Sequence, residues 1–365
     1  MTTIARAAVL EAVGRPVSVR ELEVIEPRAG EVRVRMLASG VCHSDLHVRD
    51  GEWNRPTPIV MGHEGAGIVE AAGPGVTTPR VGDLVALSWL IPCGVCRWCR
   101  RGQVWSCPDS PSYRHTLLDG ETAFRGARSY CAIATMASMS VVPAAAAITV
   151  PPATDPAAAA LIGCCVTTGV GAVQKTAAVT PGSSVAVIGL GGVGLSCVMG
   201  AVVAEATQIV AIDRVAGKLD VARSIGATHT ILASDDAAAT AEALRELTDG
   251  GPDFVFEAIG RPSTVELAIA ALPVGGTAVL VGMTPVGERA GFEVYPFVDG
   301  GRRILGSNYG SAEPTIDFPR YAAWSIEGRL PVNRLIDRRI ALDDVEDAFA
   351  AMREGRFIRQ VIEFD

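Results

Sequence analysis

The sequence lacks the surplus of positive charge that nucleic-acid-binding proteins carry. Its 32 lysines and arginines are outnumbered by 40 aspartates and glutamates, which gives a formal net charge of −8 and a pI near 5.3. Because binding to phosphates needs a basic surface, nucleic acid is disfavoured as the main partner. With 49% hydrophobic and 20% charged residues, the chain also lacks the composition of a disordered protein and can bury a sizeable core.

The sequence also lacks a recognisable export signal and a convincing membrane segment. No basic stretch followed by an apolar one opens it, so we expect a cytoplasmic protein. Residues 176–204 carry no charge and are long enough to cross a bilayer, but they contain a Pro-Gly turn and five further glycines. A buried strand, a tight turn and a buried helix explain this run better, because parallel strands are apolar on both faces. We therefore expect no membrane association.

The 365 residues predict two domains. Up to about residue 150, short segments bounded by Gly, Pro and Asp predict a small β-rich unit. After about residue 165, apolar strands alternate with helical segments, which predicts a doubly wound parallel sheet of α/β class. The clearest predicted strands are 32–37, 67–71 and 83–87 in the first part and 185–189, 208–212, 254–258 and 277–282 in the second. Predicted helices include 217–224 and one that starts in the alanine run 157–160.

A glycine-rich turn follows the predicted strand 185–189. The turn contains Gly189, Gly191, Gly192 and Gly194. Glycines at this spacing would allow a tight turn, close approach of the backbone to a pyrophosphate and close helix–strand packing. The pyrophosphate would lie at the helix N-terminus. The strand 208–212 ends at Asp213, 19 residues after Gly194. An acid there accepts a ribose 2′-hydroxyl and repels a 2′-phosphate, so the pattern favours NAD over NADP. The alternative is a packing turn without a ligand.

Four of the nine cysteines, Cys93, Cys96, Cys99 and Cys107, fall within fifteen residues. In a cytoplasmic-looking chain this clustering indicates a metal or reactive thiols rather than disulfides. Four thiolates on a compact loop suit a closed, structural zinc site. An iron–sulfur cluster is the alternative, but the seven-residue gap and a hydride-transfer context favour zinc.

A second set of metal-binding side chains lies elsewhere in the sequence. Cys42 and His63 offer a thiolate and an imidazole, although each taken alone is more often a packing residue. Cys164 makes a metal site the better interpretation of this pair, because it would supply a third ligand. It ends the segment Leu-Ile-Gly-Cys just before the predicted nucleotide-binding region.

With these motifs in order, the sequence resembles the zinc-dependent medium-chain alcohol dehydrogenases over essentially its whole length, in the class I and class III or the aryl and primary alcohol branches. The resemblance implies a GroES-like β-rich catalytic domain at 1–165, with a structural-zinc lobe at 93–107. It further implies a Rossmann NAD-binding domain at 166–308 and a return to the catalytic domain at 309–365. The matching motifs are Gly40 to His47, Gly62 to Glu64 with Gly67 and Gly73, the four-cysteine lobe, Leu161 to Cys164 with Thr167 to Gly169, the glycine turn with Asp213, and Ile358 with Arg359.

Carried over to this chain, the resemblance assigns a catalytic zinc with one open position to Cys42, His63 and Cys164, and a second zinc to the four cysteines. Cys165 is a rival to Cys164, but the Leu-Ile-Gly-Cys pattern favours Cys164. Asp45 would orient His63. The other implied residues are Glu64 beside the metal, Ser44 and His47 in a proton relay, Thr168, Val193, Asp213, Lys218 and Arg359 in cofactor binding, and Trp53, Trp89 and Met283 in the substrate pocket.

One position departs from well-known family members. Some of them place an arginine on the cofactor pyrophosphate where this chain has His43, although a histidine also occurs there in the family. A histidine is neutral above about pH 6.5, so we expect weaker cofactor binding and fast NADH release.

The leading hypothesis is an NAD-linked dehydrogenase for primary alcohols, aromatic or terpenoid ones included, and the two tryptophans suggest the aromatic class. A second is a thiol-dependent formaldehyde dehydrogenase acting on S-hydroxymethyl-thiol adducts. A third is a non-catalytic nucleotide-binding protein on the same fold, because fold alone does not determine function. By analogy with the family we expect a homodimer that pairs the sheet edge near 304–309, with a tetramer as the alternative.

Overall fold

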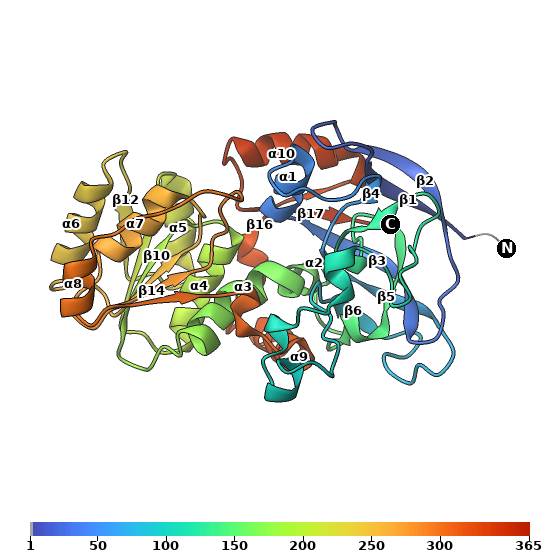
Figure 1. Cartoon of the computed structure of the whole chain (residues 1–365), viewed down its shortest axis with the longest axis horizontal. Coiled ribbons are helices and arrows are strands. Elements are labelled where there is room, and N and C mark those ends of the chain that lie inside the picture. Colours follow the sequence, from blue (N-terminus) through green and yellow to red (C-terminus); the bar gives the residue numbers. More distant parts are fainter. Residues whose placement is uncertain (1–2) are drawn as a thin grey trace. The chain divides into compact units, whose positions relative to one another are not determined.

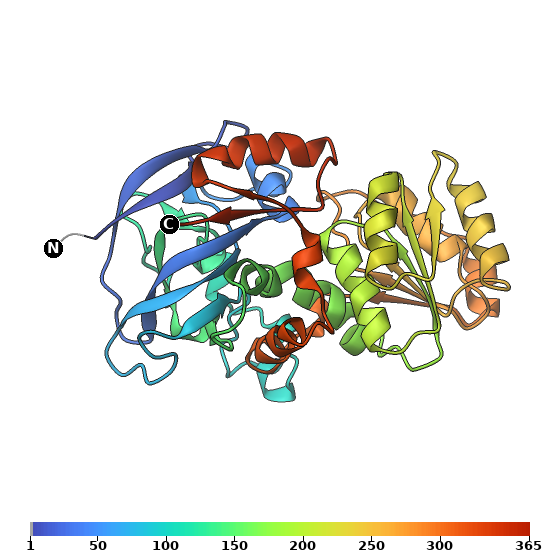
Figure 2. The ribbon, with the colours of Figure 1, turned by 180° about the vertical axis from the view of Figure 1, so that it is seen from behind.

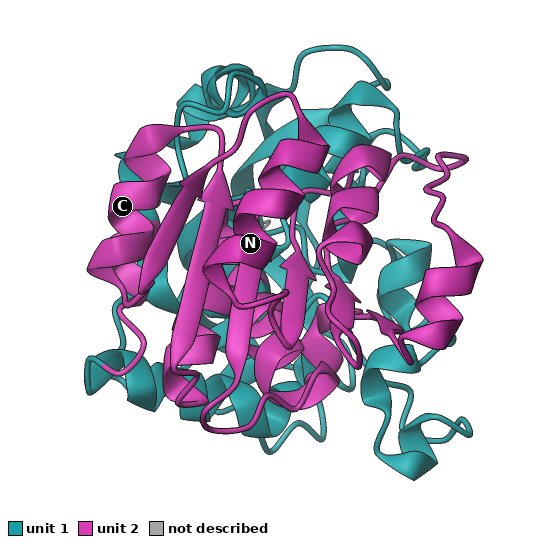
Figure 3. Cartoon of the chain, turned by 90° about the vertical axis from the view of Figure 1, so that its left-hand side faces the viewer, with its two compact units in different colours: residues 1–164, 313–328, 336–365 teal, residues 165–312, 329–335 magenta. Residues whose placement is uncertain are grey.

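The computed structural model describes residues 3–365, and the path of the chain can be followed in Figures 1 and 2. It divides into two compact units (Figure 3). Unit 1 comprises the chain up to Cys164 together with 313–328 and 336–365, and unit 2 comprises 165–312 and 329–335. These units do not test the domain bounds expected from the sequence, which stay a prediction.

Unit 1 contains two mainly antiparallel sheets. One has the strand order β2-β1-β4-β7, and the other has the order β16-β17-β3-β5-β6-β9, with β8 paired to β3. The strands predicted at 32–37, 67–71 and 83–87 correspond to β3, β5 and β6. The strands are β1 (Thr3–Leu10), β2 (Ser18–Val24), β3 (Glu31–Val41), β4 (Ile59–Val60), β5 (Glu64–Ala72), β6 (Leu84–Leu87), β7 (Arg128–Ser129), β8 (Met139–Pro143), β9 (Ala147–Thr149), β16 (Ile336–Ile340) and β17 (Arg359–Glu363).

Alternation along β3 explains why this strand lies at the centre of unit 1. Val32, Val34 and Met36 are fully buried, whereas the intervening Arg33 and Arg35 are partly exposed, as a strand period of two requires. The C-terminal strand β17 pairs antiparallel with the end of β3, so that Gln360 lies opposite Val41. Figure 2 shows this red strand beside the blue β3. The helices of unit 1 are α1 (His43–Asp50), α2 (Pro156–Leu161), α9 (Pro314–Ile326) and α10 (Val345–Arg353).

Unit 2 is built on a six-stranded sheet in which every pair is parallel, in the order β12-β11-β10-β13-β14-β15. Its strands are β10 (Ser184–Ile188), β11 (Gln208–Asp213), β12 (His229–Leu232), β13 (Phe254–Glu257), β14 (Thr277–Leu280) and β15 (Arg303–Gly306). Its helices are α3 (Thr167–Gly171), α4 (Gly192–Val203), α5 (Ala216–Ser224), α6 (Ala237–Leu247), α7 (Pro262–Ala270) and α8 (Val294–Asp299). The four predicted strands of this half correspond to β10, β11, β13 and β14, and the predicted helix 217–224 corresponds to α5.

Helices cover both faces of this parallel sheet. Ala186 and Ile188 of β10 pack with side chains of α6 and α7 in one apolar cluster. Helix α4 contacts β10, β11 and β13 but contributes no side chain to that cluster, so it lies on the other face. The uncharged run 176–204 thus forms a buried strand, a turn and a buried helix, and the predicted doubly wound α/β fold is confirmed.

One apolar helical stretch among the described residues is long enough to cross a membrane. It spans Pro156–Thr176, where α2 and α3 are joined by a π-helical turn, Ile162–Val166, and followed by a second, Ala172–Thr176. However, 89% of its most apolar window is buried within the protein. Burial of this extent is what a core helix requires.

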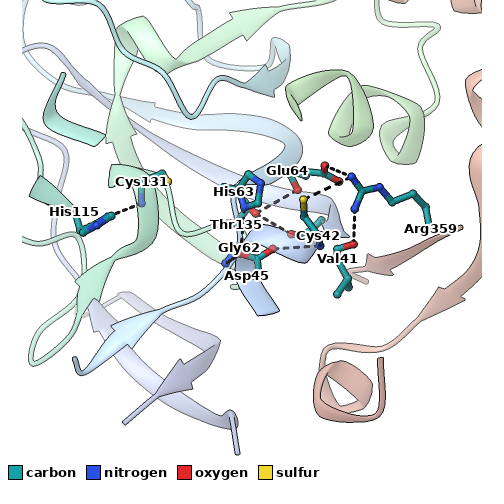
Figure 4. Close-up of polar contacts among 11 residues, drawn as sticks. Val41, Cys42, Asp45, Gly62, His63, Glu64, His115, Cys131, Thr135 and Arg359 are labelled. Atoms are coloured by element: carbon teal, nitrogen blue, oxygen red, sulfur yellow. Dashed lines mark hydrogen bonds and ion pairs between the residues drawn. The ribbon is translucent and has the colours of Figure 1, made fainter. Parts of the chain in front are cut away.

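A buried histidine in unit 1 makes stability depend on pH. His115 is 4% exposed and adopts a left-handed backbone conformation with φ of 59°. Its Nδ1 accepts the backbone N–H of Cys131 at 3.1 Å (Figure 4), and its ring stacks on Tyr130. Burial, reinforced by the charges of Arg55 and Arg128, lowers the pKa of His115 to about 4.

We predict that His115 destabilises the fold as the pH falls. The folded state holds the ring neutral, whereas the unfolded chain binds a proton near pH 6.5, so stability declines between pH 6.5 and 4. His115→Asn keeps an acceptor for the Cys131 N–H and tolerates positive φ. Between pH 7 and 5 the native protein should lose about 2 kcal/mol more unfolding free energy than this variant, measured by urea denaturation. His229→Asn, at an exposed histidine, should behave like the native protein. An equal pH dependence in all three proteins would contradict the prediction.

Candidate functional site

The Asp45 carboxylate joins two segments of unit 1. Cys42 lies at the N-terminus of α1 and Asp45 in its first turn. The Cys42 N–H donates to Asp45 Oδ2 at 3.2 Å, and the Gly62 N–H donates to Oδ1 at 3.2 Å. His63 Nδ1 lies 3.2 Å from the same Oδ1 (Figure 4). Because an ionised carboxylate can only accept, Nδ1 carries the proton and His63 Nε2 is left as a potential metal ligand.

Four buried side chains converge next to this carboxylate. Cys42, His63, Glu64 and Cys164 each offer one potential ligand atom, and these atoms all lie within 4.8 Å of one another. They come from the end of β3, the start of β5 and the π-helical turn Ile162–Val166 that follows α2. The small residue Gly40 leaves room for the cluster, since a Cβ there would lie 2.1 Å from Glu64 Oε2.

A buried arginine balances the charge of this cluster. Arg359 Nη2 lies 3.1 Å from Glu64 Oε1 and 3.6 Å from Cys42 Sγ, and Nη1 donates to the Val41 carbonyl at 2.9 Å (Figure 4). The other oxygen, Glu64 Oε2, is buried and has no hydrogen-bond partner among residues 3–365. Burial raises the pKa of Glu64 to about 7 against the opposing charge of Arg359. A hydrogen bond with Cys164 and the charge of Arg359 hold the pKa of Cys42 well below its usual range.

The cluster has the chemistry of a zinc site. Two thiols and an imidazole form the ligand set of an open, catalytic zinc, and the unpartnered Glu64 oxygen would gain a counter-charge from a cation. Cys165 is also buried but is not among the four converging residues. The residues present therefore fit the expected metal.

The four-cysteine lobe of unit 1 also has the geometry of a zinc site. The Sγ atoms of Cys96 and Cys99 lie 3.5 Å apart, and Cys93–Cys99 and Cys96–Cys107 are each 4.0 Å apart. Four sulfurs around one zinc at about 2.3 Å lie about 3.8 Å apart. All nine cysteines are free, so no disulfide explains this proximity. Backbone N–H groups lower the pKa of Cys93 to about 7, whereas burial raises that of Cys99 to about 12.

The glycine turn of unit 2 connects β10 to α4. Gly189 has φ of 91°, and a Cβ on Gly194 would lie 1.7 Å from the Gly189 carbonyl oxygen. Gly191 has φ of −76° and open space around a Cβ. At the end of β11, Asp213 accepts the N–H of Leu190 through Oδ2 at 2.7 Å and that of Val215 through Oδ1 at 2.9 Å. The turn thus presents the free amides of a helix N-terminus beside a carboxylate.

The remaining predicted residues are distributed over both units. Their cofactor, relay and pocket roles stay predictions. In unit 1, His43 is exposed, Ser44 and His47 are half-buried on α1, Trp53 is buried and Trp89 is half-buried; in unit 2, Thr168, Val193 and Lys218 are half-buried and Met283 is exposed.

Tyr130 was not identified from the sequence. Its ring meets the His63 ring edge-on, with centroids 5.5 Å apart. No motif surrounds Tyr130, and only the folded chain brings it to the cluster.

We predict that Cys164 but not Cys165 holds a metal. Cys164→Ala should lose one zinc per chain while the four-cysteine lobe keeps its own, and Cys165→Ala should keep both, because only Cys164 belongs to the cluster. Elemental analysis of the purified proteins measures this. Loss of zinc from Cys165→Ala, or two zincs in Cys164→Ala, would reverse the assignment.

We predict that the two glycines of the turn differ in role. Gly194→Ala should destabilise the fold, because the new methyl group meets a backbone carbonyl. Gly191→Ala should leave the melting temperature nearly unchanged but weaken nicotinamide nucleotide binding, because that glycine would allow pyrophosphate to approach the backbone. Calorimetric titration and thermal unfolding separate the two effects. Unchanged affinity in Gly191→Ala would favour a packing turn without a ligand.

Comparisons with known proteins agree with this geometry. Residues 28–152 match the alcohol dehydrogenase GroES-like domain, and residues 192–326 match the zinc-binding dehydrogenase family. An alcohol dehydrogenase zinc-binding domain protein from Burkholderia ambifaria is 36% identical with a TM-score of 0.95, and benzyl alcohol dehydrogenase from Acinetobacter calcoaceticus is 32% identical with a TM-score of 0.94; each alignment covers 100% of both chains.

A protein from Sinorhizobium meliloti described as a zinc-binding dehydrogenase and bound to NADP is 29% identical, with a TM-score of 0.85 over 99% of this chain and 100% of that one. These matches support an oxidoreductase that uses zinc and a nicotinamide cofactor on a small-molecule substrate. The chain belongs to the zinc-dependent alcohol dehydrogenase family of medium-chain dehydrogenases.

Proposed function

We propose that this enzyme is an NAD-dependent dehydrogenase that interconverts primary alcohols, aromatic ones above all, and their aldehydes. The observation that carries the proposal is the buried group of Cys42, His63, Glu64 and Cys164, whose ligand atoms converge within 4.8 Å. The 32% identical relative is a benzyl alcohol dehydrogenase, which favours an aromatic substrate. The tryptophans Trp53 and Trp89 suit the same class of substrate.

Three side chains of the cluster would hold the catalytic metal. Bound at Cys42, His63 and Cys164, zinc would supply a Lewis acid that makes an alcohol oxygen more acidic. Asp45 keeps His63 in the tautomer whose Nε2 is available. Glu64, charge-balanced by Arg359, provides a carboxylate beside the metal position. The zinc held by the four cysteines would be structural, because a set of four thiolates leaves no position open.

The proton released by the alcohol needs a route to solvent, and α1 carries two groups suited to it. The hydroxyl of Ser44 can accept a proton and donate its own by rotation. His47 follows three positions later on the same helix, with 20% of its side chain exposed to solvent. Ser44 would act at the inner end of this relay and His47 at the outer end.

NAD rather than NADP would accept the hydride. Asp213 ends β11 and keeps its carboxylate beside the glycine turn through bonds to the Leu190 and Val215 amides. That position suits a ribose 2′-hydroxyl and repels a 2′-phosphate. Further cofactor contacts would come from Lys218, Thr168, Val193 and Arg359. His43 would replace the arginine that some family members place on the pyrophosphate.

A homodimer is the assembly that unit 2 supports best. β15 is the last strand of the six-stranded sheet and carries unpaired backbone groups along one edge. The preceding helix α8 exposes Val294, Tyr295 and Val298 to 64%, 77% and 69%. An apolar surface next to a free sheet edge is typical of a protein–protein interface, and a second copy of the chain would cover both.

We predict that Asp213→Ser reverses the cofactor preference. Removing the carboxylate should weaken NAD and improve NADP use, because the repulsion of the 2′-phosphate disappears. The ratio of kcat/KM for the two cofactors measures the change, with Asp220→Ser on the exposed face of α5 as the control. A native enzyme that already uses NADP at least as well as NAD would refute the assignment.

We predict that Ser44→Ala slows benzyl alcohol oxidation by at least about 10²-fold, because alanine cannot pass a proton. Zinc content and NAD affinity should stay nearly unchanged. His47→Gln should lose less, roughly tenfold, since water or buffer can replace the outer group. The rates are measured as NADH formation, under conditions in which a kinetic isotope effect with deuterated alcohol shows that hydride transfer limits turnover. Near-native rates in both variants would remove the relay from the account.

A further inference from the structure

His47 is held by the two residues that follow the end of its helix. Gly51 ends α1 in a left-handed conformation with φ of 85°, and a Cβ there would lie 2.4 Å from Val13 Cγ1. The chain therefore turns back at this glycine, and the Trp53 N–H donates to the His47 carbonyl at 3.2 Å. The turn returns the Glu52 and Trp53 side chains to the imidazole of His47.

Both side chains contact the ring directly. The Glu52 carboxylate forms an ion-pair contact with His47 Nδ1. The Trp53 ring, which is buried, stacks on the imidazole with centroids 4.6 Å apart and planes 26° apart. His47 is thus fixed from its Nδ1 edge and from one face, whereas 20% of its side chain stays open to solvent.

Arg49, which lies between His47 and Glu52 in sequence, has acidic partners of its own. Arg49 binds Asp50 at 2.9 Å and also pairs with Glu346, so it does not compete for Glu52. The His43 ring also lies near His47, at a centroid distance of 6.1 Å. Glu52 is therefore the acidic partner of the His47 imidazole.

An ionised carboxylate at Nδ1 determines the tautomer. The carboxylate can only accept, so the Nδ1 nitrogen carries hydrogen and Nε2 carries the lone pair. Histidines that act as general bases are commonly held in this way, with an acid on Nδ1 and the lone pair of Nε2 free to accept a proton. The stacked Trp53 lies against one face of the ring and opposes a rotation that would exchange its two nitrogens.

We propose that Glu52 is a positioning residue for His47, holding the Nδ1 proton so that Nε2 accepts the proton that leaves through the relay. The inference rests on the proposed relay through Ser44 and His47 and adds to it the group that orients its outer base. Glu52 acts through His47 and does not itself touch substrate or cofactor.

The experiment is a double-mutant cycle on the zinc-loaded enzyme. Benzyl alcohol oxidation is measured in the native protein, E52Q, H47Q and the double variant, with E52D as the conservative change and E246Q, at an exposed carboxylate of α6, as the control. E52Q should lower kcat roughly threefold to tenfold and leave the KM for alcohol and the zinc content unchanged. In the H47Q background the same change should cost nothing further, and E52D and E246Q should keep near-native kcat.

Three outcomes would overturn the proposal. A native kcat in E52Q, with a clear loss in H47Q, would show that His47 needs no acidic partner and would leave the relay intact. An equal loss from E52Q with and without His47 would show a general structural effect. No loss in H47Q would remove both the relay and the role of Glu52.

Discussion

The buried Asp45 carboxylate is the interaction on which the proposed metal site depends. It accepts the N–H groups of Cys42 and Gly62 and lies on Nδ1 of His63, so one side chain fixes two proposed ligands from segments about twenty residues apart. Each of these groups would be costly to bury without a partner. Satisfied together, they hold the thiol of Cys42 and the Nε2 of His63 toward the same position before any metal arrives.

Charge explains the rest of the cluster. The Glu64 carboxylate, the His63 imidazole and the thiols of Cys42 and Cys164 converge in a buried volume beside Asp45, and Arg359 is the cation that pairs with Glu64. Buried charges need partners of opposite sign, and a divalent cation supplies what the arginine alone does not. The antiparallel pairing of β17 with β3 brings Arg359 to this place from the far end of the chain. The proposed metal site and the C-terminal strand are thus linked through electrostatics.

Local sequence patterns predicted most of the fold and the four-cysteine lobe, whereas the set of Cys42, His63 and Cys164 was predicted from the resemblance to the dehydrogenase family. The glycine spacing and the apolar strands identified unit 2, because these features depend on residues close together in the chain. The sequence did not predict contacts set by folding, such as Tyr130 against His63 or Glu52 against His47. It assigned Arg359 to the cofactor pyrophosphate, a role that stays a prediction, but it did not reveal that this side chain pairs with Glu64, 295 positions away in sequence. Motif spacing carries no information about such a pair.

The zinc affinity of Asp45→Asn tests most directly whether this carboxylate organises the catalytic centre. Asparagine has a similar shape but lacks the charge that orients and supports His63. In competition with a chelator, the cluster site should bind zinc roughly tenfold to a hundredfold more weakly than in the native enzyme. The four-cysteine lobe should hold its zinc as before and serve as the internal reference. Native affinity at both sites in Asp45→Asn would contradict the account.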